Sequence, residues 1–448
     1  MPDKPYSAPP HDKANPLALL PLLLFLAIFV GSGVYFSLQG IPNAFYQISP
    51  NVAILPAITL ALILGSGKLS ARMDSFLEGV RDPNIIIMCL IYLLAGAFAT
   101  ATQGIGSIDA TVNWGLSILP TSFLLPGLFI IAAFMATAMG TSMGVIATVA
   151  PLALGLSSQT GLNCSWCMGA VVSGAMFGDN LSLISDTTIA SVNTQGAKFK
   201  EKFILNATFA IPAMIITILI FYMVSTPAGD FEIAAYDGVK IIPYLVILAL
   251  ALAGLNVLVV LIIGIVVAGF VGFATTDTYS LVIFSKHIAG GFASMQEILI
   301  LSLLVGGLSY LTNKQGGLEF LIHHIEKIAL KLRHKKESPR IGEMSISAIS
   351  SLADICTANN TVAIILSGGI AKKLAKKHGV SPERSACLID IFTCAFQGLL
   401  PYSAQLLLAS SISGLSPLAI MTHVIYSPLL AFVTVLGIIF KWPQFKTK

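Results

Sequence analysis

The sequence predicts an all-α polytopic membrane protein with two inverted-topology repeats, about ten transmembrane helices and two re-entrant hairpins that contain broken helices. The first observation behind this prediction is the scarcity of charge: 10% of the 448 residues are charged and 56% are hydrophobic, whereas a soluble domain carries about 25% charge. The runs 14–67, 110–178, 241–276 and 391–440 contain no charged residue, and each is long enough to cross a bilayer. These properties exclude a soluble enzyme, a nucleic-acid binder and a disordered protein. Continuous rather than alternating apolar runs also exclude a β-barrel.

The second observation is the order of apolar runs along the chain. A polar, proline-rich arm covers 1–16, and the apolar run after it lacks a cleavage pattern, so it is expected to be a first helix and not a signal peptide. Two later stretches, 121–158 and 343–371, are apolar but interrupted by small polar residues, which favour re-entrant hairpins over simple spans. The remaining spans are expected near 17–38, 50–67, 84–103, 166–192, 203–225, 240–254, 256–273, 298–313, 385–412 and 415–440.

The third observation is a weak similarity between the two halves. An offset of 219 in the numbering places Thr141-Ser142 on Asn360-Thr361 and Asp186 on Gln405. A slightly shorter offset relates Gly96 to Gly306. The shared order of spans and interrupted stretches is more persuasive than these sparse identities. The predicted organisation is an arm at 1–16, a first membrane repeat at 17–225, an inter-repeat loop at 226–239, a second membrane repeat at 240–440 and a basic tail at 441–448.

The placement of lysine and arginine predicts that the repeats are inverted. With the N-terminus in the cytoplasm, the basic stretch 68–83 is inside, and the stretches 39–49 and 104–120, which lack lysine and arginine, are outer loops. If 121–158 enters and leaves on the outer side, the lysines at 198, 200 and 202 return to the cytoplasm. The second hairpin, with basic residues on both flanks, then enters from the cytoplasmic side. We therefore expect a multi-pass protein of the plasma (cytoplasmic) membrane with both termini inside.

An ion or substrate site is expected where the interrupted segments meet, because irregular backbone at membrane depth is tolerated only in protein or beside a water-filled cavity. Asp179 and Asp186 are carboxylates in an apolar segment, at a cost of at least ~2.5–3.5 kcal/mol each, and are candidate Na⁺ ligands. In the second half amides replace them, and these could bind Na⁺ through carbonyl oxygens or hydrogen-bond an organic solute. Helix capping and interhelical hydrogen bonds are the structural alternative. The candidates are Thr141, Ser142, Asp179, Asn180, Ser182, Ser185, Asp186, Thr187, Thr188, Thr357, Asn359, Asn360, Thr361, Gln397, Ser403 and Gln405.

Other polar residues in apolar surroundings leave two interpretations open. Asp354 and Asp390 could take part in proton movement or cap helix ends. Asp277, Lys286 and His287 are expected in a solvated loop between spans. The stretch from His323-His324 to Lys336 is typical of a basic surface helix that meets anionic lipid.

The segment Gly178-Asp-Asn-Leu-Ser-Leu-Ile-Ser-Asp-Thr-Thr188, preceded by Thr141-Ser-Met-Gly144, resembles the motifs of the NhaC-type Na⁺/H⁺ antiporter family of the ion transporter superfamily. The resemblance implies two hairpins in inverted repeats, an elevator-like or related alternating-access movement and a possible homodimer. It also implies a cation-site region at Asp179, Ser182, Ser185, Asp186, Thr187 and Thr188, with Thr141 and Ser142 opposite.

The sequence departs from the family pattern in two places. Antiporters of the family often have a basic or bulky residue after Gly-Asp and a proline within the motif, where this chain has Asn180 and Leu183. The stretch Asp354-Ile-Cys-Thr-Ala-Asn-Asn-Thr361 looks more like a branch suspected of carrying amino acids or other small organic solutes.

The predicted function is a cation-coupled secondary transporter that resembles Na⁺/H⁺ antiporters, and not an enzyme. The alternative is Na⁺- or H⁺-coupled transport of an amino acid or small organic solute. A channel and an intramembrane aspartyl protease, in which two membrane aspartates share a proton, are more remote. The expected partners are the lipid bilayer and a small ion or organic solute, without nucleic acid. No cofactor is expected beyond Na⁺ and/or H⁺ as coupling ion, and no ATP-binding loop motif is present.

Overall fold

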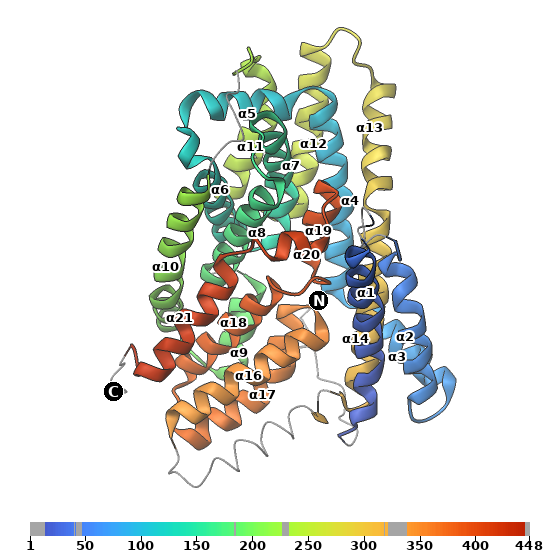
Figure 1. The fold of residues 1–448 in the computed structure, drawn as a ribbon, viewed down its shortest axis with the longest axis vertical. Coiled ribbons are helices and arrows are strands. Elements are labelled where there is room, and N and C mark those ends of the chain that lie inside the picture. The colour runs from blue at the N-terminus through green and yellow to red at the C-terminus, as the bar shows by residue number, and fades with distance from the viewer. Residues whose placement is uncertain are drawn as a thin grey trace.

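The computed structural model, drawn in Figure 1, describes residues 14–39, 41, 47–182, 185–225, 233–317, 319–320 and 338–443. Most of the expected N-terminal arm and the end of the expected basic tail lie outside these residues. The same holds for the expected surface helix from His323-His324 to Lys336.

The described chain is helical throughout, which confirms the predicted fold class. Among these residues, eight segments are long and apolar enough to cross a membrane, and shorter apolar helices accompany them. The first repeat contains α1 (Leu20–Leu38), α2 (Pro50–Leu64), α3 (Leu69–Val80), α4 (Pro83–Gly104), α5 (Ser107–Ile118), α6 (Leu124–Met139), α7 (Ser142–Thr160), α8 (Cys164–Leu181), α9 (Asp186–Gln195) and α10 (Phe199–Val224). The second contains α11 (Ile242–Leu252), α12 (Val257–Thr275), α13 (Leu281–Ser294), α14 (Gln296–Lys314), α16 (Pro339–Thr357), α17 (Asn360–His378), α18 (Pro382–Gln397), α19 (Ala404–Ser413), α20 (Pro417–Met421) and α21 (Tyr426–Phe440).

Two helical hairpins enter the molecule from opposite ends. The first consists of α6 and α7 and the second of α16 and α17, and in Figure 1 they lie in the upper and the lower half. Each hairpin reverses at one residue in the left-handed conformation, Gly140 (φ 68°) in the first and Ala358 (φ 50°) in the second. Each is followed by a broken span, α8–α9 in the first repeat and α18–α19 in the second. The inverted arrangement expected from the sequence is therefore present.

Helix ends fix the register between the repeats. Left-handed glycines end equivalent helices, and polar residues occupy equivalent N-cap positions. The offset within every such pair is 218, so the offset of 219 expected from the sequence is too long by one. Sparse identities between apolar helices do not define register so finely, whereas a helix cap has a single possible position. The pairs are Thr141 with Asn359, Gly161 with Gly379, Ser185 with Ser403 and Gly196 with Gly414.

Three segments expected as loops contain helices. α3 lies within 68–83 and α5 within 104–120, and α13 includes Lys286 and His287, with Asp277 just before it. α13 packs against α4, where the hydroxyl of Thr100 donates to the carbonyl oxygen of His287 (2.7 Å). The polar residues of this segment suggested solvent, but the helix is amphipathic and buries Gly291 against α4.

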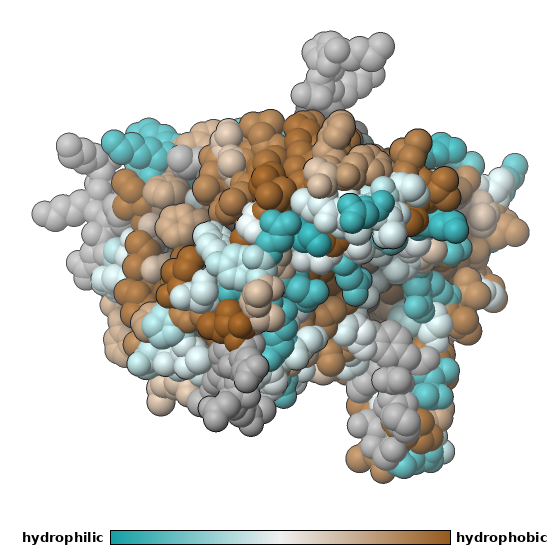
Figure 2. All heavy atoms as spheres, turned by 90° about the horizontal axis from the view of Figure 1, so that it is seen from above, coloured by the Kyte–Doolittle hydropathy of each residue, from teal (hydrophilic) through white to brown (hydrophobic). Residues whose placement is uncertain are grey.

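The outer surface matches an environment of lipid. Large apolar side chains are exposed on several long helices, including Leu23 on α1, Leu219 on α10 and Phe270 on α12. Seen from above in Figure 2, apolar residues gather mainly along the outer edge and polar residues across the middle. In water such a surface would be unfavourable, so the protein is an integral membrane protein.

The crossing of α4 and α13 depends on two glycines and provides a first prediction. A Cβ atom at Gly291 would clash with the carbonyl oxygen of Gly96, whereas a Cβ at the neighbouring Gly290 would meet nothing within 4 Å. We expect Gly291→Ala to force the helices apart and to lower the free energy of unfolding by about 1–3 kcal/mol. The matched control Gly290→Ala should leave it unchanged or slightly raised. Thermal unfolding of both variants in detergent measures the difference, and equal melting temperatures would refute this account of the crossing.

Candidate functional site

A cavity of about 90 Å³ lies where the hairpin turns meet the broken spans. Side chains of both repeats and of α4 line it, with Asn84, Met88 and Ile91 on α4. Most of the residues expected from the sequence to form a site are brought together here: Thr141, Ser142, Asp179, Asp186, Thr187, Asn359, Asn360, Thr361, Gln397 and Gln405.

The cavity has an approximate two-fold design. In the register that the helix caps define, cavity residues of the first repeat pair with cavity residues of the second. Asp179 pairs with Gln397, so a carboxylate in one half is matched by an amide in the other. The further pairs are Thr141 with Asn359, Ser142 with Asn360 and Thr187 with Gln405. The two repeats thus supply different chemistry to a single site.

Asp179 connects the two hairpin turns. Its Oδ2 atom accepts a hydrogen bond from the hydroxyl of Ser142 in the first hairpin (3.0 Å) and a longer one from the amide of Asn360 in the second (3.5 Å). Gln405 Nε2 donates to Ser142 Oγ (3.1 Å). The carboxylate is 6% exposed, and no lysine, arginine or histidine is among the cavity's described lining residues. Its charge is therefore without a cationic partner in the cavity.

Gln397 holds the second hairpin turn. Its Nε2 atom donates to the carbonyl oxygen of Ala358 (3.0 Å) and to Oε1 of Gln405 (2.9 Å). Its Oε1 atom is buried and has no hydrogen-bond partner within the described part of the chain. This oxygen can accept a proton donor or contact a cation.

Helix ends surround the cavity. α7, α17, α9 and α19 begin beside it, and α6, α16, α8 and α18 end beside it. Helix N-termini favour negative charge, and free carbonyl groups at C-termini favour cations. Asp186 is the first residue of α9 and is exposed, so it shares the cavity without the burial of Asp179.

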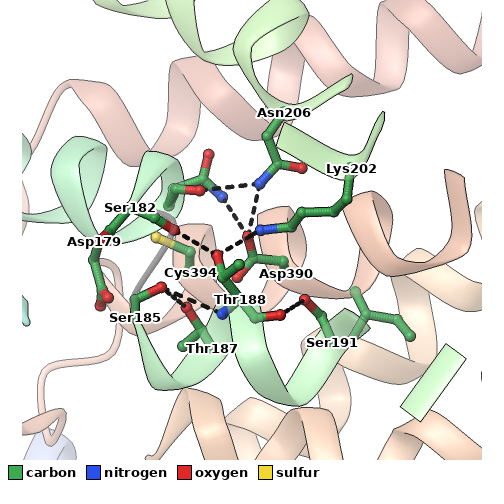
Figure 3. A network of polar contacts seen from close by, with 12 residues as sticks. Asp179, Ser182, Ser185, Thr187, Thr188, Ser191, Lys202, Asn206, Asp390 and Cys394 are labelled. Atoms are coloured by element: carbon green, nitrogen blue, oxygen red, sulfur yellow. Dashed lines mark hydrogen bonds and ion pairs between the residues drawn. The ribbon is translucent and has the colours of Figure 1, made fainter. Parts of the chain in front are cut away.

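Next to Asp179, outside the cavity, lies a polar network that contains a buried ion pair (Figure 3). Lys202 on α10 is 1% exposed, Asp390 on α18 is 0% exposed, and their charged atoms are 2.6 Å apart. Lys202 also donates to the hydroxyl of Thr188 (2.7 Å). Asp390 Oδ2 accepts two further bonds, from Asn206 Nδ2 (2.7 Å) and Asn180 Nδ2 (3.3 Å).

This network fixes the end of α8 next to the cavity. Asn206 Nδ2 donates to the carbonyl oxygen of Asn180 (3.0 Å), close to the last turn of α8. Asn180 follows Asp179 directly, and in Figure 3 Asp179 points away from the ion pair. The buried pair is electrically neutral, so it positions the Asp179 backbone without adding net charge to the site.

The other candidate residues make local contacts near the cavity. Ser182 donates to the carbonyl oxygen of Thr137 (2.9 Å). Ser185 and Ser403 cap α9 and α19. Thr357 bonds within the second hairpin turn and lines a neighbouring, smaller pocket.

Lys202 and Asn206 were missed from the sequence. Lys202 was expected in the cytoplasm with its neighbours, but it is the fourth residue of α10 and points into the protein. The sequence pattern that could have revealed them is their spacing of four residues, which places both on one face of a helix. Phe209 and Ala213 continue this face, which is buried. Asp390, for which two roles were left open, is the partner of this lysine.

The buried pair provides a second prediction. Lys202→Met leaves Asp390 buried without its counter-charge, which typically costs about 3–5 kcal/mol of stability. In Lys202→Met/Asp390→Asn the amide oxygen still accepts from Asn180 and Asn206, so most of that loss should be recovered. Thermal unfolding in detergent measures both variants. A double variant no more stable than the single one would contradict this role of the pair.

The sequence is similar to those of known antiporters. Residues 13–226 match the Na⁺/H⁺ antiporter family. The chain is 28% identical to the Na⁺/H⁺ antiporter NhaC of Bacillus subtilis over 44% of this chain and 46% of that protein. It is 20% identical to NhaC of Alkalihalophilus pseudofirmus over 87% of this chain and 90% of that protein. It is also 25% identical to a malate-2H⁺/Na⁺-lactate antiporter of Bacillus subtilis, over 48% of this chain and 46% of that protein.

The chain thus matches about half the length of the two Bacillus subtilis relatives and most of the third. The family match covers α1 to α10, which include the first hairpin, Asp179, Lys202 and Asn206 but not Asp390. The chain is accordingly similar in sequence to the NhaC-type Na⁺/H⁺ antiporters, and the match to the antiporter family lies in its first half.

Proposed function

We propose that the protein is a cation-coupled secondary transporter that exchanges Na⁺ for protons by alternating access. The observation that carries the proposal is the Asp179 carboxylate, buried between the two hairpin turns without a cationic partner among the described lining residues. A carboxylate at this depth needs a cation or a proton. Asp179 would therefore bind Na⁺, and exchange requires only that Na⁺ binding and proton binding favour different facing states of the protein.

The donor atoms support an alkali cation. Asp179, Ser142, Thr187 and the amide groups offer hard oxygen ligands. Asp186 adds a second carboxylate at the rim.

The proposal includes the orientation of the protein in the membrane. Arg72 and Arg81 lie near the N-terminal end of α4, and a basic cluster ends α17, at the end from which the second hairpin enters. By the positive-inside rule this end faces the cytoplasm, which supports cytoplasmic termini in the plasma membrane. The cation would then be released or captured as the hairpins and broken spans move against α4 and its neighbours.

A second candidate function is transport of a small organic solute with the cation. The amide half of the cavity favours it: Asn360, Gln397 and Gln405 offer hydrogen-bonding groups that a bare ion does not need. The cavity also has room for more than one water-sized group. The malate-lactate antiporter among the relatives is a precedent for organic substrates.

The test of the cation site is Asp179→Asn in proteoliposomes with an imposed Na⁺ gradient. Loss of a charged interaction worth about 1.5–3 kcal/mol raises the apparent KM for Na⁺ roughly 10- to 100-fold. Proton movement is measured with a pH-sensitive dye, and the control Asp277→Asn removes an exposed carboxylate outside the cavity. Wild-type behaviour of Asp179→Asn would refute the site.

The two candidate functions are separated by adding solutes to the same assay. Na⁺-driven proton movement without any solute supports the antiporter. If flux requires an amino acid, lactate or malate, the organic-solute function is correct, and Gln397→Leu should then reduce solute affinity more than Na⁺ affinity. The reduction follows from loss of the unpartnered Oε1 acceptor.

A further inference from the structure

Asp354 is a buried carboxyl group outside the cation cavity. It lies on α16, four residues before the turn of the second hairpin, and it is 0% exposed. Neither Oδ1 nor Oδ2 has a hydrogen-bond partner within the described part of the chain. In this it differs from Asp179 and Asp390, whose Oδ2 atoms both accept hydrogen bonds.

Among the described residues, the titratable groups near Asp354 do not supply a positive charge. α16 packs mainly against α17 and α18, with further contacts to α14 and α21. The described titratable groups that interact electrostatically with Asp354 are Cys356 on α16, Cys394 on α18 and Tyr402 between α18 and α19. The hydroxyl of Tyr402 donates to the carbonyl oxygen of Ile355 (2.6 Å), and the thiol of Cys394 to that of Met176 (3.3 Å).

An ionised carboxylate in these surroundings would lack both a counter-charge and hydrogen-bond donors. Burying such a charge is strongly unfavourable, and a carboxyl group in this position takes up a proton instead. Asp354 is therefore neutral while α16 is packed as observed. It can ionise only after water or a donor reaches it.

The fold itself does not need a carboxyl group at this position. In the first repeat the equivalent residue is Ala136, on the inner face of α6. There α6 packs so tightly on α8 that a Cβ atom at Gly178 would clash with the Cβ of Ala136. The equivalent of Gly178 in the second repeat is Phe396. A small apolar residue thus suffices in one hairpin, whereas the other carries an ionisable group.

Asp354 is connected to the cavity through the hairpin turn. Its carbonyl oxygen accepts from the backbone N–H of Ala358 (2.7 Å), and the carbonyl oxygen of Ala358 accepts from Gln397 (3.0 Å). Gln397 in turn bonds Gln405, which reaches Ser142 and hence Asp179. A movement of this turn alters the packing of Asp354 and the contacts of the cation site together.

We propose that Asp354 is a proton-binding site, separate from the cation cavity, that releases its proton when α16 moves away from α18. This inference rests on the proposed function, because it names where a coupled proton is carried. The protonated form stabilises the packed hairpin and the ionised form stabilises the separated one. A difference of this kind in affinity for the two states is the requirement for coupling.

The first test detects the proton directly and does not depend on transport. Infrared spectra of the protein in lipid at neutral pH are compared between the wild type and Asp354→Asn, in the region of the protonated carboxyl stretch. The wild type should contain a band that the variant lacks, while Asp277→Asn should retain it. Spectra without this difference would overturn the proposal.

The second test concerns coupling in proteoliposomes. Asp354→Asn should lose proton movement driven by a Na⁺ gradient while still exchanging labelled Na⁺ for unlabelled Na⁺. Asp354→Ala, which copies the first repeat, serves as a second variant if the buried amide impairs folding. Proton movement at the wild-type rate in a folded variant would overturn the proposal. If the wild type shows no Na⁺-driven proton movement, the proposed function fails, and the infrared result still decides whether Asp354 holds a proton.

Discussion

A helix that ends inside a bilayer leaves backbone N–H and C=O groups without water, and the described structure is organised around the places where these groups find partners. Ser185 and Ser403 cap the second halves of the broken spans, and Asn359 caps α17. Gln397 and Asn206 bind carbonyl oxygens at other helix ends. The same polar groups also line or support the cavity. One set of residues therefore both satisfies the backbone at the helix ends and shapes the candidate binding site.

The three buried carboxyl groups Asp179, Asp354 and Asp390 have different surroundings. Lys202 and Asp390 neutralise each other, and their network holds the end of α8. Asp179, one residue before Asn180, accepts hydrogen bonds from both hairpin turns, and Asp354 has no hydrogen-bond partner within the described residues. In the proposed mechanism these groups bind a cation and a proton, respectively.

The sequence was sufficient for the fold class, the two hairpins and most residues of the cavity, because clusters of Gly, Asn and Asp are rare inside apolar runs unless the helix breaks there. Prediction from the sequence failed where contacts between distant residues determine the structure. Lys202 was placed in the cytoplasm because loop lysines usually obey the positive-inside rule, and its partner Asp390 is 188 residues away. α13 was expected as a loop because its fit against Gly96 is not visible in hydropathy. The repeat register was wrong by one position because only helix caps define it.

The correspondence between the two repeats has a consequence for how a second conformation can be built. Because the hairpins and broken spans of the two halves are related by inversion, exchanging their local arrangements converts a molecule accessible from one side into one accessible from the other. The two end states are therefore related by an approximate two-fold rotation in the membrane plane, and they would be equal in energy if the halves were identical. Gln397 stands opposite Asp179, and Asp354 opposite Ala136, so the halves differ and the two end states need not be equal in energy. The ion gradients alone set the direction of net transport.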